Sequence, residues 1–587
     1  MKHKKLTSYL KPYWLPAIIS PLFMIGEVIA DLNLTKKMSL IVNDGVLKND
    51  MSAIIEIGLT MLAIAAVGGF MGIFCAWTAS VAAQGFGNDL RCDMFRRVMY
   101  LSEEQTDKFT TGSLVTRITN DITALQDLVN MILRMFVRAP IFFIGGIYFT
   151  LTLNLRFGTV VLFALPFVII CVIVMLKLVN PMFLKVQTKL DRVNAIVQEN
   201  VSGARVVKAY TREDYEINRF DGANTDFRDT SFKVFKTMAF LWPSLGLVMN
   251  AAVIAIYWIG AQLVDLSALN DTLEEFSVGD VMAAASYITQ ILSSIMMVSM
   301  MFQQLARGKA SAGRVREVLW SDPVIVGGEK TDGEDKDIAV ELRGVSFRYP
   351  GSQGDDVLSG IDLKVRRGET VAIIGATGSG KSSLVSLLPR YYDATAGEVL
   401  IDGVNVRDYD LHALREKFGF VLQKSELFSG TIADNIRWGN EDATDEEVVR
   451  AAKIAQADDF IMGFNDDYET MVSEKGASLS GGQKQRMSIA RAIVRNPEII
   501  IFDDSTSALD LGTEARLQRA LRENLDGTTV IMIAQRIASV KNADRIAVLE
   551  QGTVTAFAPH DELMQTSETY RDIYNSQMKN TEGGNEQ

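Results

Sequence analysis

The residues with the clearest chemistry lie between 375 and 382, where the sequence reads Gly-Ala-Thr-Gly-Ser-Gly-Lys-Ser. A glycine-rich backbone can turn several N–H groups toward one phosphate, and the following lysine and serine add a cation and a Mg²⁺ ligand. An apolar run precedes this loop and a helical pattern follows it, which is the setting that phosphate binding requires. We predict that the phosphates of a nucleotide are held by Gly375, Thr377, Gly378, Ser379, Gly380, Lys381, Ser382 and Ser383.

A second apolar run, residues 499–502, ends in Asp503. Such a run suits a central parallel strand that is buried on both faces. Its terminal carboxylate, together with the hydroxyl of Ser382, is expected to hold Mg²⁺ directly or through water.

Hydrophobicity before about residue 305 predicts the elements that precede this site. Six apolar segments are each long enough to cross about 30 Å of hydrocarbon. They run over approximately Trp14–Leu34, Ile54–Ser80, Met131–Leu153, Gly158–Val179, Met238–Val264 and Val281–Phe302. A buried core in a soluble protein could imitate one such segment but hardly six.

The positions of Lys and Arg predict the orientation of these segments. The connections 81–130 and 180–237 are rich in both residues, which places them and both termini in the cytoplasm. Their helical apolar spacing indicates that the membrane helices continue beyond the membrane, with short turns around 102–112 and 209–213 where a partner domain could bind. No targeting segment is recognised, and the soluble portion is acidic. Both features favour a bacterial inner membrane.

Composition excludes several other classes of protein. The formal net charge of −12 argues against a chain that coats nucleic acid. Three scattered cysteines fit neither a disulfide framework nor a zinc site. The predicted fold is a helical membrane domain with six transmembrane helices (1–320), a linker (321–336), an α/β phosphate-loop domain (337–577) and a disordered tail (578–587).

The sequence Leu-Ser-Gly-Gly-Gln at 479–483 lies between the phosphate loop and Asp503, and here the chain resembles ATP-binding cassette (ABC) proteins. With six preceding spans, it resembles an ABC exporter half-transporter over essentially its whole length. The resemblance implies that Tyr349 stacks on adenine and that Gln423 contacts Mg²⁺. It also implies a partner half-transporter, because each ATP of the family lies between one chain's phosphate loop and the other's signature, here Ser480, Gly481, Gly482 and Gln483.

Two residues depart from the family pattern. Asp504 stands where the family usually has the glutamate that orients the attacking water, and Gln535 stands where it has a histidine. Shortening the side chain by one methylene withdraws the carboxylate by about 1.5 Å, and a misplacement near 1 Å can slow a reaction about a hundredfold. Glutamine carries neither a proton nor a charge near pH 7. The hypothesis is a site that binds ATP but hydrolyses it slowly, in a heterodimer with a non-identical partner. A conservative, working Asp504 is the alternative.

The transported compound is less well defined by the sequence. Glu27 in the first span either attracts cationic amphiphiles or pairs with Arg134 or Arg138 in the third. Met297 belongs to a group of methionines in the sixth span that either line an adaptable pocket or pack against lipid and protein. Lipophilic compounds, drugs among them, are the substrate class that the resemblance implies, with membrane lipids as neighbours. Lipid flipping, peptide export and a purely regulatory ATP-gated subunit are the alternatives.

Overall fold

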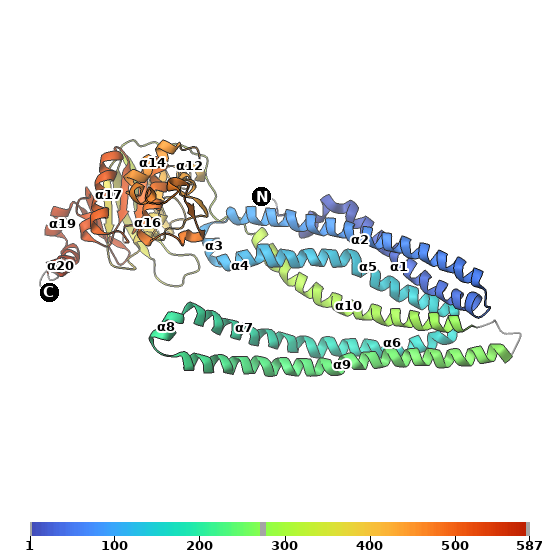
Figure 1. Cartoon of the computed structure of the whole chain (residues 1–587). Helices are drawn as coiled ribbons and strands as arrows, with labels where there is room; N and C mark the ends of the chain where they lie inside the picture. Colours follow the sequence, from blue (N-terminus) through green and yellow to red (C-terminus); the bar gives the residue numbers. More distant parts are fainter. Residues whose placement is uncertain (1–2, 270–276, 507, 583–587) are drawn as a thin grey trace. The chain divides into compact units, whose positions relative to one another are not determined.

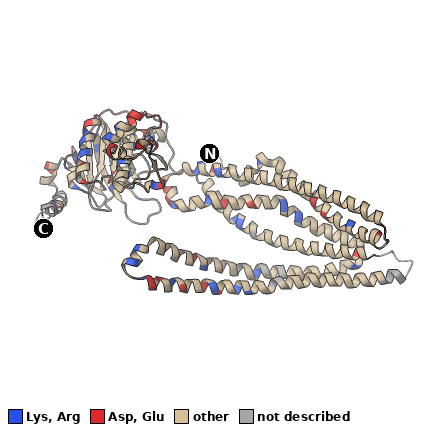
Figure 2. Ribbon diagram, in the orientation of Figure 1, with Lys and Arg blue, Asp and Glu red and all other residues tan. Residues whose placement is uncertain are grey.

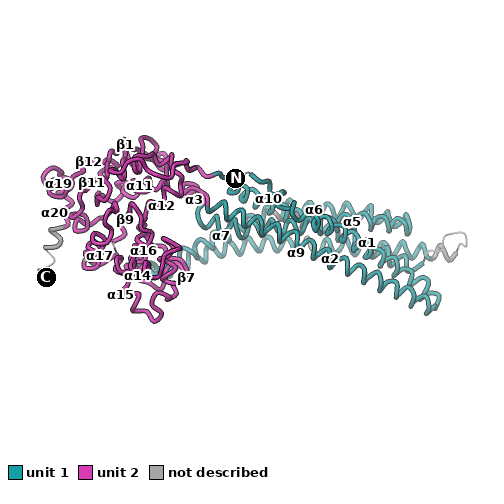
Figure 3. Tube along the Cα trace, turned by 90° about the horizontal axis from the view of Figure 1, so that it is seen from above, with its two compact units in different colours: residues 1–99, 110–322 teal, residues 100–109, 323–587 magenta. Residues whose placement is uncertain are grey.

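The computed structural model describes residues 3–269, 277–506 and 508–582. It divides into two compact units (Figure 3). The helical unit comprises residues 1–99 and 110–322, and the sheet unit comprises residues 100–109 and 323–587. Most of the predicted linker 321–336 is therefore part of the sheet unit, as is the short segment 100–109.

Long helices make up the helical unit (Figure 1). They are α1 (Trp14–Leu40), α2 (Met51–Met99), α5 (Ile122–Leu153), α6 (Leu155–Val174), α7 (Asn180–Ser202), α9 (Glu213–Leu269) and α10 (Val278–Leu319). Shorter helical elements connect them, namely η1 (Leu6–Tyr13), η2 (Ile41–Val46), α4 (Thr111–Thr116), η3 (Arg117–Asp121), η4 (Met175–Val179) and α8 (Ala204–Ala209). The start of α10 is fixed by a capping box between Ser277 and Asp280, and Asp280 also accepts a 2.7 Å hydrogen bond from Ser39 of α1.

Five helical runs of the described residues are long and apolar enough to cross a membrane. They are Leu6–Val46, Met51–Met99, Thr111–Leu153, Glu213–Val264 and Val278–Leu319. The fourth predicted span, Gly158–Val179, falls on α6 and η4, where the described apolar helix Leu155–Ile170 is shorter than the other five. The structure thus supports five spans, and the sixth stays a prediction.

Several helices extend well beyond the thickness of a membrane. The 57 residues of α9 correspond to about 86 Å of helix, against about 30 Å of hydrocarbon. Charged side chains gather toward the α8 end of the α7 and α9 pair, whereas the opposite part of the pair is mostly uncharged (Figure 2). The charged part therefore suits water and the uncharged part suits lipid.

An ion-pair cluster joins α1 to α5. Arg138 of α5 donates hydrogen bonds to Glu27, at 2.7 Å, and to Asp31, at 3.3 Å. Glu27 and Asp31 lie one turn apart on the same face of α1. The guanidinium also lies 5.2 Å from the ring centre of Phe142. Of the two partners that the sequence left open for Glu27, the structure selects Arg138.

The sheet unit contains a six-stranded sheet in the order β12-β11-β3-β10-β9-β6, in which only the β12–β11 pair is antiparallel. Its strands are β3 (Thr370–Ile374), β6 (Phe418–Val421), β9 (Ile499–Asp503), β10 (Thr529–Ile533), β11 (Arg545–Glu550) and β12 (Thr553–Ala558). A four-stranded antiparallel sheet is formed by β1 (Ile338–Phe347), β2 (Leu358–Arg366), β4 (Ala396–Ile401) and β5 (Val404–Asn405). A two-stranded sheet pairs β7 (Gly430–Thr431) with β8 (Met471–Val472).

The sheet unit also contains several helices, most of them short. They are α3 (Glu103–Phe109), α11 (Lys381–Ser386), α12 (Leu411–Glu416), α13 (Ile432–Arg437), α14 (Asp445–Ile454), α15 (Asp458–Ile461), α16 (Gly481–Val494), α17 (Leu511–Asn524), α18 (Ile537–Val540), α19 (His560–Thr566) and α20 (Glu568–Glu582). Because α20 runs to Glu582, residues 578–582 of the predicted disordered tail are helical, and residues 583–587 lie outside the described part of the chain.

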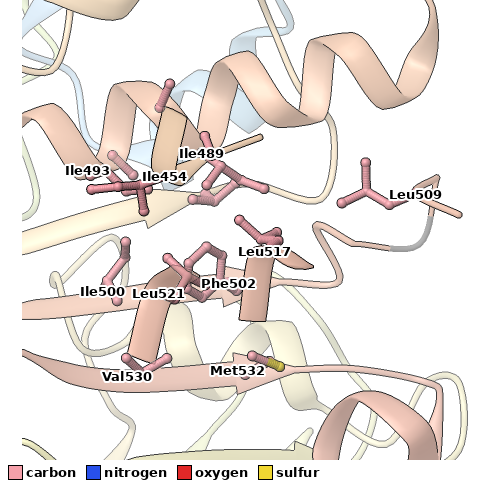
Figure 4. Close-up of a cluster of buried hydrophobic side chains, with 14 of the residues drawn as sticks. Ile454, Ile489, Ile493, Ile500, Phe502, Leu509, Leu517, Leu521, Val530 and Met532 are labelled. Carbon is pink, nitrogen blue, oxygen red and sulfur yellow. The ribbon is translucent and has the colours of Figure 1, made fainter. Parts of the chain in front are cut away.

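The strand β9 is buried on both faces, as its apolar sequence predicted. Ile500 and Phe502 belong to the hydrophobic cluster that includes Leu517 and Leu521 of α17 (Figure 4), and Ile499 and Ile501 belong to a second cluster that includes β1 and β2.

The neighbouring strands β3, β10, β9 and β6 run parallel, so their carboxyl ends lie at one edge of the sheet. The residues that follow these strands are therefore brought together.

The ion-pair cluster predicts unequal effects of removing its members. Arg138→Gln leaves two neighbouring carboxylates without a cation, whereas Glu27→Gln leaves Arg138 paired with Asp31. Breaking a fully buried pair costs about 3–5 kcal/mol, and partial exposure of these side chains reduces the expected loss for Arg138→Gln to about 1–2 kcal/mol. Thermal unfolding of the detergent-solubilised protein measures the difference. Equal melting temperatures for the two variants would contradict this role of Arg138.

Candidate nucleotide site

The phosphate loop connects β3 to α11. Gly378 and Gly380 have φ values of +85° and +98°, which side chains other than glycine rarely adopt. This backbone turns the loop around the N-terminus of α11, where free N–H groups attract an anion. The buried hydroxyl of Ser379 has no hydrogen-bond partner among the described residues. An unsatisfied donor at this position fits a loop that binds phosphate oxygens.

Lys381 lies over the same loop. Its ammonium group donates to the carbonyl oxygens of Gly375, at 2.9 Å, and Ala376, at 2.8 Å. Burial lowers the pKa of Lys381, while the carboxylates of Asp504 and Asp503 oppose that shift. The lysine therefore places a positive charge beside two acidic groups and at the mouth of the loop.

Asp503 ends β9 and accepts a 2.8 Å hydrogen bond from the hydroxyl of Ser382. Burial raises the pKa of Asp503, the Ser382 hydrogen bond lowers it, and the neighbouring Asp504 raises it further. Two adjacent carboxylates with hydroxyl and amide oxygens nearby are the hard ligands that Mg²⁺ prefers. These residues fit the ion, with Ser382, Asp503 and Gln423 as the groups that would hold it; when bound, it would neutralise phosphate charge.

Asp504 follows directly and is held by two glutamines. The amide of Gln535, which follows β10, donates to its carboxylate at 2.8 Å, and the amide of Gln423, which follows β6, donates to the same oxygen at 3.4 Å. Asp504 has a φ of +47°, a left-handed conformation that aspartate adopts more readily than most residues. The shorter acid and the two amides thus form one hydrogen-bonded group.

A cleft of about 370 Å³ brings most of the predicted residues together. Its lining consists of Val357, Thr377, Gly378, Gly380, Lys381, Ser382, Ser383, Gln423, Asp503, Asp504, Ile533 and Gln535. Sequence analysis missed Val357 and Ile533, because an apolar residue before a strand or at its end carries no chemical signal. Gly375 and Ser379 belong to the loop but do not line the cleft among the described residues.

Tyr349 contacts helix α11 next to the phosphate loop. Its hydroxyl is 2.9 Å from the hydroxyl of Ser383, and 38% of the residue is exposed. An exposed ring next to the phosphate loop is able to stack on a base.

The signature residues lie at the start of α16, outside the described lining of the cleft. Ser480 is the N-cap, and Ser480 and Gln483 cap each other through 3.3 Å and 2.8 Å hydrogen bonds. Gly481 is exposed and Gly482 is partly exposed. The exposed helix N-terminus is thus available to an anion that this chain's own loop does not hold.

Glu27 and Met297, the two residues predicted for the substrate path, do not line a common cavity among the described residues. Glu27 is held in the ion pair with Arg138. A cavity of about 330 Å³ in the helical unit is lined by Ala139, Pro140, Phe143, Leu165, Ile169, Ser294, Ile295 and Val298. Met297 is not part of this described lining, although it lies on the same helix, α10.

Two family models match the chain. Residues 6–296 match the model described as the ABC transporter transmembrane region, and residues 358–507 match the model described as ABC transporter. Among solved structures, a bacterial Atm1-family ABC exporter with ATP bound superposes with a TM-score of 0.78 at 26% identity. That comparison covers 97% of this chain and 99% of the other.

Full-length relatives give the same result. The uncharacterized ABC transporter ATP-binding protein YfiB of Bacillus subtilis is 37% identical, over 98% of both chains. An ATP-dependent lipid A-core flippase of Chromobacterium violaceum is 32% identical, over 98% of this chain and 97% of its own. The putative multidrug export ATP-binding/permease protein YgaD of Bacillus subtilis is 32% identical, over 98% and 99%. The chain therefore belongs to the ABC transporter family, as an exporter with a transmembrane domain followed by an ATP-binding domain.

Proposed function

We propose that this chain is one subunit of a heterodimeric exporter and that its own site binds Mg²⁺ and ATP but hydrolyses ATP slowly. The observation that carries the proposal is the 2.8 Å hydrogen bond between Gln535 and Asp504. A carboxylate that activates water needs a free oxygen within about 3 Å of it. Here one oxygen of an already short side chain is held by amide donors.

Gln535 is also expected to slow hydrolysis through its own chemistry. An amide can orient the γ-phosphate, but it neither accepts a proton nor carries a charge that would stabilise the developing negative charge. Both departures lie in the same cleft, so their effects fall on one ATP. Slow hydrolysis there is the expected result.

The binding groups support tight retention of the nucleotide. Lys381, Ser382 and Asp503 line one cleft and have the chemistry to hold phosphate and Mg²⁺, and Tyr349 offers a partly exposed ring. The exposed signature, Ser480 to Gln483, is complete and suits a nucleotide held by a second chain. A homodimer would contain two slow sites, so we propose a non-identical partner that carries an active one.

The proposed cargo is a lipophilic or amphipathic compound, with drugs as the first candidates. The apolar cavity next to Phe143 and Ile295 suits such a molecule, and the named relatives include a lipid flippase and a putative multidrug exporter. ATP-driven closure of two cassettes would turn the membrane cavity outward, and hydrolysis at the partner's site would reset it. We place the chain in a bacterial inner membrane with six spans and both termini cytoplasmic.

The chain purified alone should bind ATP and turn it over slowly. We expect a rate at least about tenfold below that of the heterodimer, since the base and the histidine position are both altered. Equilibrium binding of labelled ATP and phosphate release measure the two properties separately. Lys381→Ala, which removes the cation of the loop, is the control that should lose binding. Rapid turnover by a self-assembled dimer would refute the proposal.

Restoring both altered residues should raise turnover more than the two single changes predict. Asp504→Glu alone places a longer acid against Gln535, and Gln535→His alone faces an acid that is too short. We expect each single variant to gain less than about tenfold and Asp504→Glu/Gln535→His to gain about a hundredfold, because the side chains are in direct contact. Single-turnover hydrolysis in the heterodimer, with the partner's site inactivated, measures the gain. Strictly multiplicative effects would show that the two residues act independently.

A further inference from the structure

An aromatic group connects the nucleotide cleft to α3 within the sheet unit. The rings of Phe347, Tyr349 and Tyr392 contact one another, with centroids 4.9 Å apart for Phe347–Tyr349 and 5.3 Å apart for Tyr349–Tyr392. At one end of the group, the Tyr349 hydroxyl meets Ser383 beside the phosphate loop. At the other end, the Tyr392 hydroxyl donates a 2.7 Å hydrogen bond to Asp107 of α3.

The helix α3 is well anchored where Tyr392 meets it. Phe109 and Gln105 are buried, and the hydroxyl of Ser102, just before the helix, accepts a 2.9 Å hydrogen bond from the backbone of Ile325. Burial raises the pKa of Glu103, and the neighbouring Asp107 raises it further. The short helix α3 is thus an integral part of the sheet unit, with which it is coloured in Figure 3.

We propose that Tyr392 is a positioning residue that makes the position of α3 depend on the base of the bound nucleotide. The proposal rests on ATP binding at this site with its adenine on Tyr349. A base stacked on Tyr349 fixes that ring, and the edge-on contact, at an interplanar angle of 83°, passes the constraint to Tyr392. The hydroxyl of Tyr392 then holds Asp107 in the position that the occupied cleft selects.

The hydrogen bond from Tyr392 to Asp107 is expected to persist over the physiological pH range. Burial and the hydrogen bond to Asp107 both raise the pKa of Tyr392, so its hydroxyl stays a donor throughout the physiological range. Only residues 100–102 separate α3 from the end of α2, and only Thr110 separates it from α4. A shift of α3 is therefore passed directly to the chain on both sides of it.

Hydrogen exchange of residues 100–112 in the full-length chain tests this link. Exchange is measured with Mg²⁺ and ATP present and, separately, with Mg²⁺ and tripolyphosphate present. Tripolyphosphate fills the phosphate loop but has no base. We expect ATP to slow exchange at least about threefold more than tripolyphosphate. Tyr392→Phe keeps the ring and removes the donor, so it should bind ATP within about twofold of the original affinity and lose the ATP-specific difference.

Two further variants distinguish loss of the Tyr392–Asp107 hydrogen bond from a general loss of protein stability. Asp107→Asn keeps an acceptor for the hydroxyl and should retain the difference, and Tyr391→Phe alters the neighbouring tyrosine and should also retain it. The proposal is overturned if Tyr392→Phe keeps the difference, if tripolyphosphate acts like ATP, or if Tyr392→Phe weakens ATP binding more than about tenfold. A chain that fails to bind ATP overturns both this inference and the proposed function, and the binding measurement distinguishes that case.

Discussion

Two adjacent carboxylates at the end of one buried strand govern the rest of the nucleotide site. Asp503 and Asp504 leave β9 side by side, at the edge where β3, β10 and β6 also end. Their charge would be unfavourable in a half-buried cleft without a cation, and Lys381 alone balances only one of them. The site is therefore suited to receive positive charge near Asp503, which a divalent ion would supply.

The same constraint explains why the two carboxylates have different surroundings. Asp503 is bonded to a hydroxyl that can also ligate an ion, so its partner changes little when an ion enters. Asp504 accepts hydrogen bonds from two neutral amides, those of Gln535 and Gln423. Two neighbouring carboxylates of one strand end thus have different hydrogen-bond partners.

Much of this site could be predicted because its determinants are local. The strand, loop and helix around Lys381 are continuous in sequence, and the apolar strand before Asp503 is recognisable by itself. The family pattern placed Asp504 and Gln535 in the same site, but their direct contact could be seen only from the order of the strands in the sheet. In the membrane part, Arg134 and Arg138 lie one turn apart, so sequence spacing could not choose between them, whereas the packing of α1 against α5 did.

Other features depend on contacts that sequence patterns do not record. The helical spacing predicted a short turn around 102–112 where a partner domain could bind. It did not predict that residues 100–109 join the sheet unit, because the binding surface for α3 is contributed by Tyr392 and Ile325, more than 200 residues later.

If this site hydrolyses ATP slowly, as proposed, the aromatic contact between Tyr349 and Tyr392 would be constrained for longer than in a site with rapid turnover. If ATP stays bound through several turnovers of a partner site, the base remains on Tyr349 and the constraint on α3 persists. The link would then hold this chain's short helix in one position, while a partner chain with rapid turnover releases its own helix in each cycle. Asymmetry in hydrolysis at Asp504 would thereby become asymmetry in the mechanical coupling of the two chains, without any difference in their folds.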